Sequence, residues 1–162
     1  MDAQRARVDR LRRRPTGGTV QINFYDGFLD QQLYLKQKAM EPELQRMRQE
    51  AAQIQNGQKR AEAMRAIDLK ERSAGTTSWE KIVEHIDHAV KLVGADHVGL
   101  GSDFDGAVMP AGMEDCTMLP KITAALFAKG YSEKDVRRIL GENVLRVMEA
   151  NEAIARRLKA KG

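Results

Sequence analysis

Two segments that combine acidic residues with glycine are the parts of this 162-residue sequence best suited to chemistry. In the first, the run Val98-Gly99-Leu100-Gly101-Ser102 leads directly into Asp103-Phe104-Asp105-Gly106. A short apolar run of this kind is typical of a buried parallel strand that delivers side chains to a loop. A carboxylate at a strand end can act as a general base or hold a substrate amine. Asp103 is therefore the first candidate catalytic residue, although the same pattern also occurs in ordinary acidic turns.

A second strand-like run ends in a similar way. Residues 19–25 are rich in β-branched and aromatic residues, which predicts a strand, and Asp26-Gly27 follows as a polar loop. In barrel enzymes the chemistry lies on the loops at the carboxyl ends of the strands. Two strands cannot form a whole active site, so the residues alone predict an α/β segment with an acidic strand-end loop. The candidate site residues at the two strand ends are Asp103, Asp105, Asn23, Tyr25 and Asp26.

The other residues that could bind a metal or act as a nucleophile are few. His85 and His88 are three apart on a predicted helix and could share a face, but apolar residues interleave them, so packing or surface roles are favoured. His97 precedes its strand and would lie at the wrong end for a barrel site. The single cysteine, Cys116, has no obvious basic neighbour, which favours a buried or inert thiol. Metalloprotease, phosphate-loop and serine-elbow motifs are absent from the sequence.

The helices that would position these strands are predicted from their caps. Thr77, with Glu80 three residues later, predicts a capping box for a helix that stops at Gly94. A strand, this helix and the next strand would form a βαβ unit with a parallel pair of strands. Ser132 and Asn143 are the predicted caps of two later helices. The inward residues predicted for the last helix are Val144, Leu145, Val147 and Met148.

Residues 29–72 form a long segment rich in helix-forming residues between the two strands. Pro42 is expected at the first turn of a helix, and Asn56-Gly57 should divide the segment into a helical hairpin. The hairpin could be a lid or a dimerisation arm, or it could be a variable surface insertion, which we favour.

The charge is concentrated at the N-terminus. The chain has a net charge of +4, and residues 1–14 contain six arginines against two aspartates. Such a segment could bind a polyanion, but it lacks interleaved aromatic residues, so a solvated helix is favoured and nucleic-acid binding is not expected. The sequence contains neither an apolar run of transmembrane length nor a signal-peptide pattern, which favours a cytoplasmic location.

Several of these segments together resemble the C-terminal part of the membrane (renal-type) dipeptidases, peptidase family M19. The matching segments are residues 17–25, 85–106, Pro110-Ala111-Gly112-Met113-Glu114-Asp115, Gly130-Tyr131-Ser132 and 139–147. The resemblance implies a (β/α)₈ barrel that hydrolyses dipeptides with two zinc ions. It also implies that Asp103 contacts the substrate and handles protons. Tyr25 is a further candidate substrate contact.

The resemblance covers about residues 17–150, which correspond to the last two β/α units of a barrel that needs about 250 residues. We therefore expect a partial barrel over residues 17–162, with a helical insertion at about 29–72 and a basic segment at 1–16. The family's zinc ligands would lie outside this chain. We expect a C-terminal fragment that is inactive alone and that pairs with a second copy or a complementing chain. The alternative is a non-enzymatic interaction module whose basic segment, residues 1–14, binds polyanions.

Overall fold

The computed structural model describes residues 17–160. The basic segment predicted at residues 1–16 therefore lies outside the described part of the chain. The regular elements, in chain order, are β1 (Val20–Asn23), α2 (Asp26–Leu29), α3 (Gln31–Ala52), α4 (Gly57–Arg72), α5 (Glu80–Val93), β2 (Val98–Ser102), α6 (Pro120–Ala128), α7 (Glu133–Arg137), the π-helical segment η3 (Arg138–Glu142) and α8 (Asn143–Lys159).

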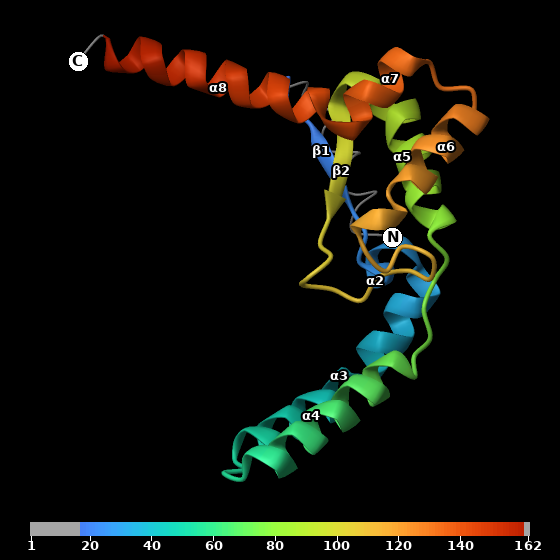
Figure 1. Ribbon diagram of the computed structural model, residues 1–162, viewed down its shortest axis with the longest axis vertical. Helices are drawn as coiled ribbons and strands as arrows, with labels where there is room; N and C mark the ends of the chain where they lie inside the picture. The colour runs from blue at the N-terminus through green and yellow to red at the C-terminus, as the bar shows by residue number, and fades with distance from the viewer. Residues whose placement is uncertain (1–16, 161–162) are drawn as a thin grey trace.

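The two strands form one parallel sheet, as the sequence predicts. Val20 is paired with Val98 and Ile22 with Leu100. Helix α5 packs along one face of this pair, and α6 lies beside α5 (Figure 1). Figure 1 also shows the α3–α4 hairpin beyond the carboxyl ends of the strands and α8 at their amino ends. The protein is thus a helix-rich α/β structure with projections at both ends of a two-stranded sheet.

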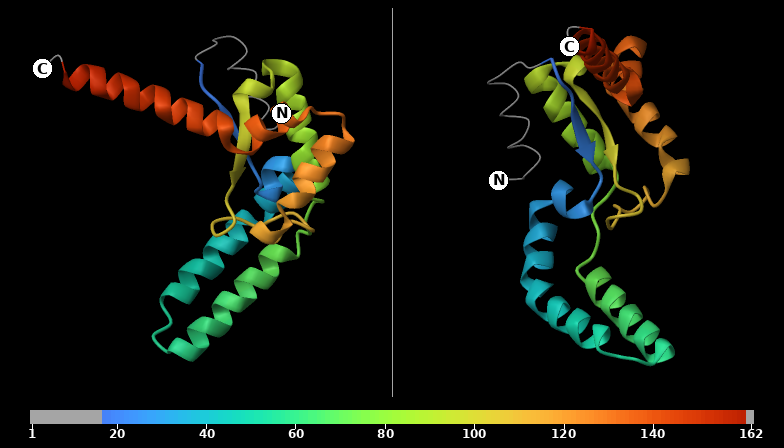
Figure 2. Two further views of the ribbon diagram at one scale, coloured as in Figure 1. Left: turned by 45° about the horizontal axis from the view of Figure 1, so that its top comes forward. Right: turned by 90° about the vertical axis from the view of Figure 1, so that its left-hand side faces the viewer.

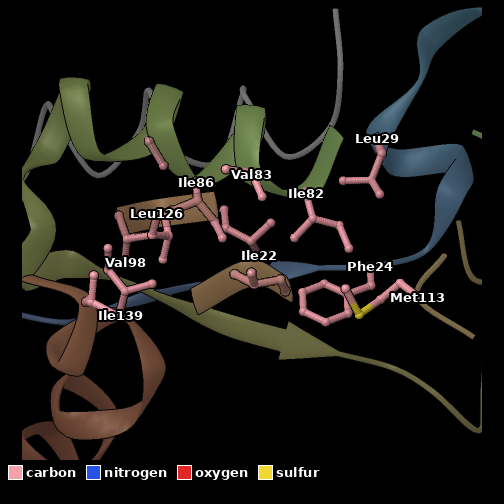
Figure 3. Packing of buried hydrophobic residues seen from close by; sticks show 13 residues of the cluster. Ile22, Phe24, Leu29, Ile82, Val83, Ile86, Val98, Met113, Leu126 and Ile139 are labelled. Atoms are coloured by element: carbon pink, nitrogen blue, oxygen red, sulfur yellow. The ribbon is translucent and has the colours of Figure 1, made fainter. Parts of the chain in front are cut away.

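The main hydrophobic core lies between the sheet and α5 (Figure 3). Ile82 and Ile86 of α5 are fully buried against Ile22 and Phe24, the residues of the first strand segment that point to this side. Complete burial of one such side chain contributes about 1.5–3 kcal/mol. His85, on the same helix, is buried with its Nε2 atom 3.1 Å from the carbonyl oxygen of Leu29. This hydrogen bond confirms the packing role predicted for that histidine.

The predicted capping box at the start of α5 is wrong. The helix begins at Glu80, and Trp79 precedes it without a side-chain cap. Residues 77–79 instead pair in parallel with the backbone at Ala111. The amide of Ala111 donates to the Thr77 carbonyl over 2.8 Å, and the amide of Trp79 donates to the Ala111 carbonyl over 3.1 Å. This pairing with a distant loop outweighs the local cap. The predicted stop at Gly94 is confirmed, with φ +85°.

The segment between the strands is the predicted helical hairpin (Figure 2). Asn56 caps α4 by accepting a hydrogen bond from the amide of Lys59 over 3.0 Å. The expectation that Pro42 begins a helix is wrong, because it lies in the interior of α3. Packing of α3 on α4 outweighs the backbone hydrogen bond that a proline removes. The residues that form this second, smaller core are Leu44, Ala51 and Ile67.

The C-terminal helices differ from the sequence prediction where they leave the body. The Ser132 cap is confirmed by a hydrogen bond from the Asp135 amide. Asn143 is not a cap: it is buried in the first turn of α8, where its side-chain amide donates to the carbonyls of Ala95 and Val98 over 2.7 and 2.9 Å. Two predictions of burial are also wrong, because Leu145 and Met148 are exposed. Cys116 is exposed too, which excludes the buried alternative for this thiol and leaves the inert one as a prediction. Most of α8 projects away from the core, so few described elements cover its apolar side chains (Figures 1 and 2).

Candidate functional site

The carboxyl ends of β1 and β2 bring Asn23 and Asp103 together. The backbone amide of Phe24 donates to the Ser102 carbonyl over 2.9 Å, and this bond keeps the two strand ends adjacent. The Asn23 side-chain Nδ2 then donates to Oδ2 of Asp103 over 3.0 Å, while its Oδ1 accepts from the amide of Tyr25 over 2.7 Å. The second bond fixes the orientation of the amide, so Asn23 presents a donor to the carboxylate.

A bulge in the sheet precedes Asp103. The register shifts between Ile22, which is paired with Leu100, and Asn23, which is paired with Ser102, so Gly101 is the extra residue. Ser102 and Asp103 both have positive φ, +42° and +97°. Such a conformation costs of order 1–3 kcal/mol at each non-glycine residue. Bulges redirect side chains at strand ends, and this one turns the Asp103 carboxylate out of the sheet.

The loop that follows leaves the Asp103 carboxylate exposed and supports it from two sides. Phe104 packs edge-on against Phe24, with ring centroids 5.9 Å apart. The amide of Gly106 donates to the Asp103 carbonyl over 3.2 Å. A Cβ atom at Gly106 would lie 2.6 Å from Oδ1 of Asp103, so a larger residue here would displace that carboxylate. Asp105 is exposed on the same loop.

Tyr25 follows β1 by two residues and is held by a chain of hydrogen bonds. Its hydroxyl donates to Oε1 of Gln37 over 2.8 Å, and Nε2 of Gln37 donates to Oδ1 of Asp26 over 2.9 Å. Burial raises the pKa of Tyr25, and the neighbouring carboxylate of Asp26 raises that pKa further. Gln37 therefore connects the base of the α3–α4 hairpin to a candidate substrate contact.

Asp26 does not occupy the polar loop that the sequence predicts. It is the first residue of α2 and is fully buried, with its amide donating to the Val108 carbonyl over 3.1 Å. Burial raises the pKa of its carboxyl group, and the hydrogen bond from Gln37 opposes this increase. Asp26 thus binds Gln37 and the backbone of Val108, and it does not line the pocket described next.

A pocket of about 700 Å³ lies in front of Asp103. Of the five candidate site residues, Asp103, Asp105 and Tyr25 line it, whereas Asn23 and Asp26 do not. One wall comes from the last turns of α4, which the sequence did not indicate as part of a site. The residues that line the pocket are Tyr25, Phe28, Asp68, Glu71, Arg72, Glu114 and the loop from Asp103 to Met109.

The wall from α4 is fixed by the same backbone pairing that displaced the predicted capping box. Besides the two bonds at Ala111, the Thr76 hydroxyl donates to the carbonyl of Met109 over 3.2 Å, so the segment leaving the hairpin is attached to the loop after β2. These partners are 33 residues apart in sequence. No local pattern in the sequence could have predicted a contact of this range.

The described residues do not fit a zinc site. Within residues 17–160, no three histidine, cysteine, aspartate or glutamate side chains are grouped closely enough to hold a metal ion. The ring nitrogens that could ligate are already used in part: His97 Nδ1 is 2.7 Å from the Gly18 carbonyl, and His85 contacts Leu29.

None of the helices in the described part of the chain is long and apolar enough to cross a membrane.

Comparison with known proteins gives one consistent family. The sequence model of the membrane dipeptidases, peptidase family M19, matches residues 9–162. This range extends beyond residues 17–150, the limits expected from the sequence. Dipeptidase ataJ of Aspergillus terreus is 42% identical over 87 residues, which are 53% of this chain and 21% of that protein. The chain thus spans about a fifth of the length of this curated relative.

Two solved structures are similar over most of the chain. A metallopeptidase from Rhodobacter sphaeroides, liganded with a phosphinate mimic of the dipeptide L-Ala-D-Ala, has 28% identity and a TM-score of 0.56; the match covers 89% of this chain and 30% of that one. The probable dipeptidase PvdM from Pseudomonas aeruginosa has 25% identity and a TM-score of 0.59, over 87% of this chain and 38% of that one.

Proposed function

Because the chain belongs to the membrane dipeptidase family, peptidase family M19, we propose that it is part of a zinc-dependent dipeptidase in which Asp103 contacts the substrate. The observation that carries this proposal is the Asp103 carboxylate, exposed at the strand end and held by Asn23, in front of a pocket that Tyr25 also lines. In this proposal, the remaining members of the site would lie in sequence outside these 162 residues.

The proposed architecture is part of a (β/α)₈ barrel. Strands β1 and β2 would be two neighbouring barrel strands, with α5 as the crossover helix between them. Each strand has one edge without a partner strand in the described part of the chain. Closing a barrel would pair both edges, and the 62–70% of the two solved relatives that this chain does not match is enough sequence to supply the other strands.

The proposed substrate is a dipeptide, and the proposed reaction is hydrolysis of its single peptide bond. The Asp103 carboxylate can accept hydrogen bonds from the ammonium group of the substrate and can take up or release a proton at its Oδ atoms. Asn23 binds Oδ2, so Oδ1 is the oxygen that would contact the substrate. Tyr25 would contact the substrate through the ring, because its hydroxyl is engaged with Gln37.

The proposed zinc ions would be held by residues outside the described part of the chain, since the described residues do not fit a metal site. The chain would therefore contribute the substrate-contacting half of the site. On this basis, the 162-residue chain alone should not hydrolyse dipeptides.

The experiment that tests the proposal is to purify the protein from its native cells and to measure its intact mass, its zinc content and its hydrolysis of L-Ala-D-Ala. We expect a species larger than 18.2 kDa that contains zinc and is active.

Asp103→Asn in this protein should lower kcat/KM by about 10²–10⁴-fold. Glu84→Gln, which removes an exposed carboxylate on α5 outside the pocket, is the matched control and should retain activity. A stable 18.2 kDa species without zinc or hydrolysis would contradict the proposal. Full activity of Asp103→Asn would exclude that residue.

A further inference from the structure

Gln37 joins the α3–α4 hairpin to the end of β1. Along α3 from Tyr34 to Ala39, Gln37 is half-buried while its neighbours are exposed. Its Oε1 accepts from the Tyr25 hydroxyl over 2.8 Å, and its Nε2 donates to Oδ1 of the buried Asp26 over 2.9 Å. Both partners follow β1 within three residues, and Tyr25 lines the pocket. The base of the hairpin is therefore bonded directly to a candidate substrate contact.

A glutamine suits this position because of its mixed hydrogen-bonding chemistry. Its side chain offers an oxygen that accepts and a nitrogen that donates, whereas an ionised carboxylate can only accept. Asp26 therefore takes the amide nitrogen of Gln37, and the amide oxygen is left for Tyr25. The Tyr25 hydroxyl must then donate to Gln37, so this proton is held by α3 and the ring is the part of Tyr25 available to a substrate.

Two further contacts fix the ring of Tyr25. It packs edge-on against Phe28, with ring centroids 5.0 Å apart, and Phe28 also lines the pocket. Gly27 borders the contact with α3: a Cβ atom there would overlap Oε1 of Gln37 and would lie 2.8 Å from Cε1 of Tyr25. A larger residue at position 27 would therefore displace the amide, the ring or both.

We propose that Gln37 is a positioning residue of the site, through which the α3–α4 hairpin sets the orientation of the Tyr25 ring. This inference rests on the proposed dipeptidase function, and it gives the hairpin a role that a variable surface insertion would lack. The other end of the hairpin reaches the same pocket, where the last turns of α4 form a wall. A ring that only binds contacts the substrate equally in the ground state and the transition state, so its displacement should change KM and not kcat.

Steady-state kinetics of the native protein with L-Ala-D-Ala test the proposal. Gln37→Met keeps the length of the side chain and removes both hydrogen bonds; it should raise KM by about three- to tenfold and leave kcat within about twofold. Gly27→Ala, which displaces the amide from the opposite side, should have the same effect. Gln45→Met, the same substitution at an exposed position of α3, is the matched control and should change neither quantity. An unchanged KM in Gln37→Met would overturn the proposal.

Tyr25→Phe separates positioning from a structural role, because it breaks the bond between Tyr25 and Gln37 and leaves the one between Gln37 and Asp26. It should raise KM as much as Gln37→Met does, and the double variant should show no further increase. Effects that multiply in the double variant would overturn the proposal, since Gln37 would then act independently of Tyr25. A loss confined to kcat would also overturn it, because misfolding of part of the protein gives that result. So would a much larger effect of Tyr25→Phe, since the hydroxyl would then contact the substrate itself.

A measurement that does not need activity separates this proposal from the proposed function. The 162-residue chain contains three tyrosines, so NMR spectra with ring-labelled tyrosine have few signals, and Tyr25→Phe identifies the one from Tyr25. Gln37→Met should shift this signal and Gln45→Met should not. An unshifted signal would overturn the positioning role whether or not the native protein hydrolyses dipeptides. A shifted signal together with an inactive native protein would contradict the proposed function alone and would support the hold of Gln37 on the ring.

Discussion

Asn23 and Asp103 are 80 residues apart in the sequence, and the side-chain amide of the first donates to the carboxylate of the second over 3.0 Å. The bond joins the carboxyl ends of the two strands at the mouth of the pocket. It is made possible by the bulge at Gly101, which advances β2 by one residue relative to β1. Asn23 is therefore a positioning residue for the candidate catalytic carboxylate.

Asn23→Ala should lower the kcat/KM of the native dipeptidase for L-Ala-D-Ala by about ten- to a hundredfold, because Asp103 loses its fixed orientation. Asn23→Asp should give a different result: a second carboxylate beside Asp103 raises the pKa of the pair, so the pH–activity profile should move upward. Thr19→Ala, at the far end of the same strand segment, is the control and should change neither quantity. An unchanged pH profile in Asn23→Asp would show that Asn23 has only a structural role.

Gly101→Ala should lower the free energy of unfolding of the chain by about 1–3 kcal/mol, as measured with urea. A Cβ atom there would lie 3.0 Å from the Ile22 carbonyl oxygen and 3.2 Å from the Asn23 nitrogen, and a neighbouring backbone cannot move aside as a flexible side chain can. Gly57→Ala is the matched control, because nothing lies within 4 Å of the added atom at the start of α4. The control should be neutral or slightly stabilising. Equal effects of the two substitutions would contradict the bulge geometry.

Asn143→Ala should destabilise the chain by about 2–3 kcal/mol. The buried side chain bonds the carbonyls of Ala95 and Val98, and removing it leaves both without this donor. Gln45→Ala, an exposed amide on α3, should change stability by less than about 0.5 kcal/mol. A loss of similar size for both variants, in urea unfolding, would mean that Asn143 does not hold α8 to the strands.

Asp26→Asn should make the chain more stable than the original at pH 7 but not at pH 3.5. Burial raises the folded-state pKa of Asp26 above its ordinary value of 3.8. Below pH 3.8 the carboxyl group holds its proton in both states, and as the pH rises toward the folded-state pKa the folded chain must bury a charge. Stability therefore falls over this range and stays lower above it. Urea titrations from pH 3.5 to 8 measure the difference between the two proteins.

Asp87→Asn is the control of opposite sign. A hydrogen bond from Lys91 lowers the pKa of Asp87, and a hydrogen bond from the Tyr131 hydroxyl lowers it by a smaller amount. Its contribution to stability is therefore present above pH 3.8 and is lost as the pH falls through the lowered pKa. This variant should be less stable than the original at pH 7, and the difference should disappear on acidification. Parallel pH dependence of the two variants would contradict one of these assignments.

The strand ends and the caps that act locally could be predicted from the sequence. Asp103 at the end of β2, the hairpin divided at Asn56 and the Ser132 cap depend on residues close in sequence, so their patterns are visible. The wall of the pocket from α4 could not be predicted, because it depends on backbone bonds between residues 76–79 and 109–111. The same bonds explain why Thr77 does not cap α5.

Burial along α8 could not be predicted from the helix alone. Its apolar spacing is that of a packed helix, but the sequence does not state which surface covers it, and the described chain leaves most of it open. The cytoplasmic location stays a prediction, and polyanion binding by residues 1–14 stays the alternative that the sequence disfavours. The same is true of the roles assigned to Asp103 and Tyr25 in the reaction.

The contact between Asp30 and Thr77 has a consequence for the order of folding. These residues are 47 positions apart, yet the Thr77 hydroxyl is 3.5 Å from Oδ2 of Asp30, because α3 and α4 fold back on each other between them. The strand partners Val20 and Val98 are farther apart in sequence, and forming a parallel pair over such a distance is slow. Once the hairpin has formed from its local contacts, most of the segment between the two strands is already ordered. The flexible loop that must be closed to pair the strands is then much shorter. Early formation of the helical hairpin would therefore lower the entropy cost of pairing β1 with β2.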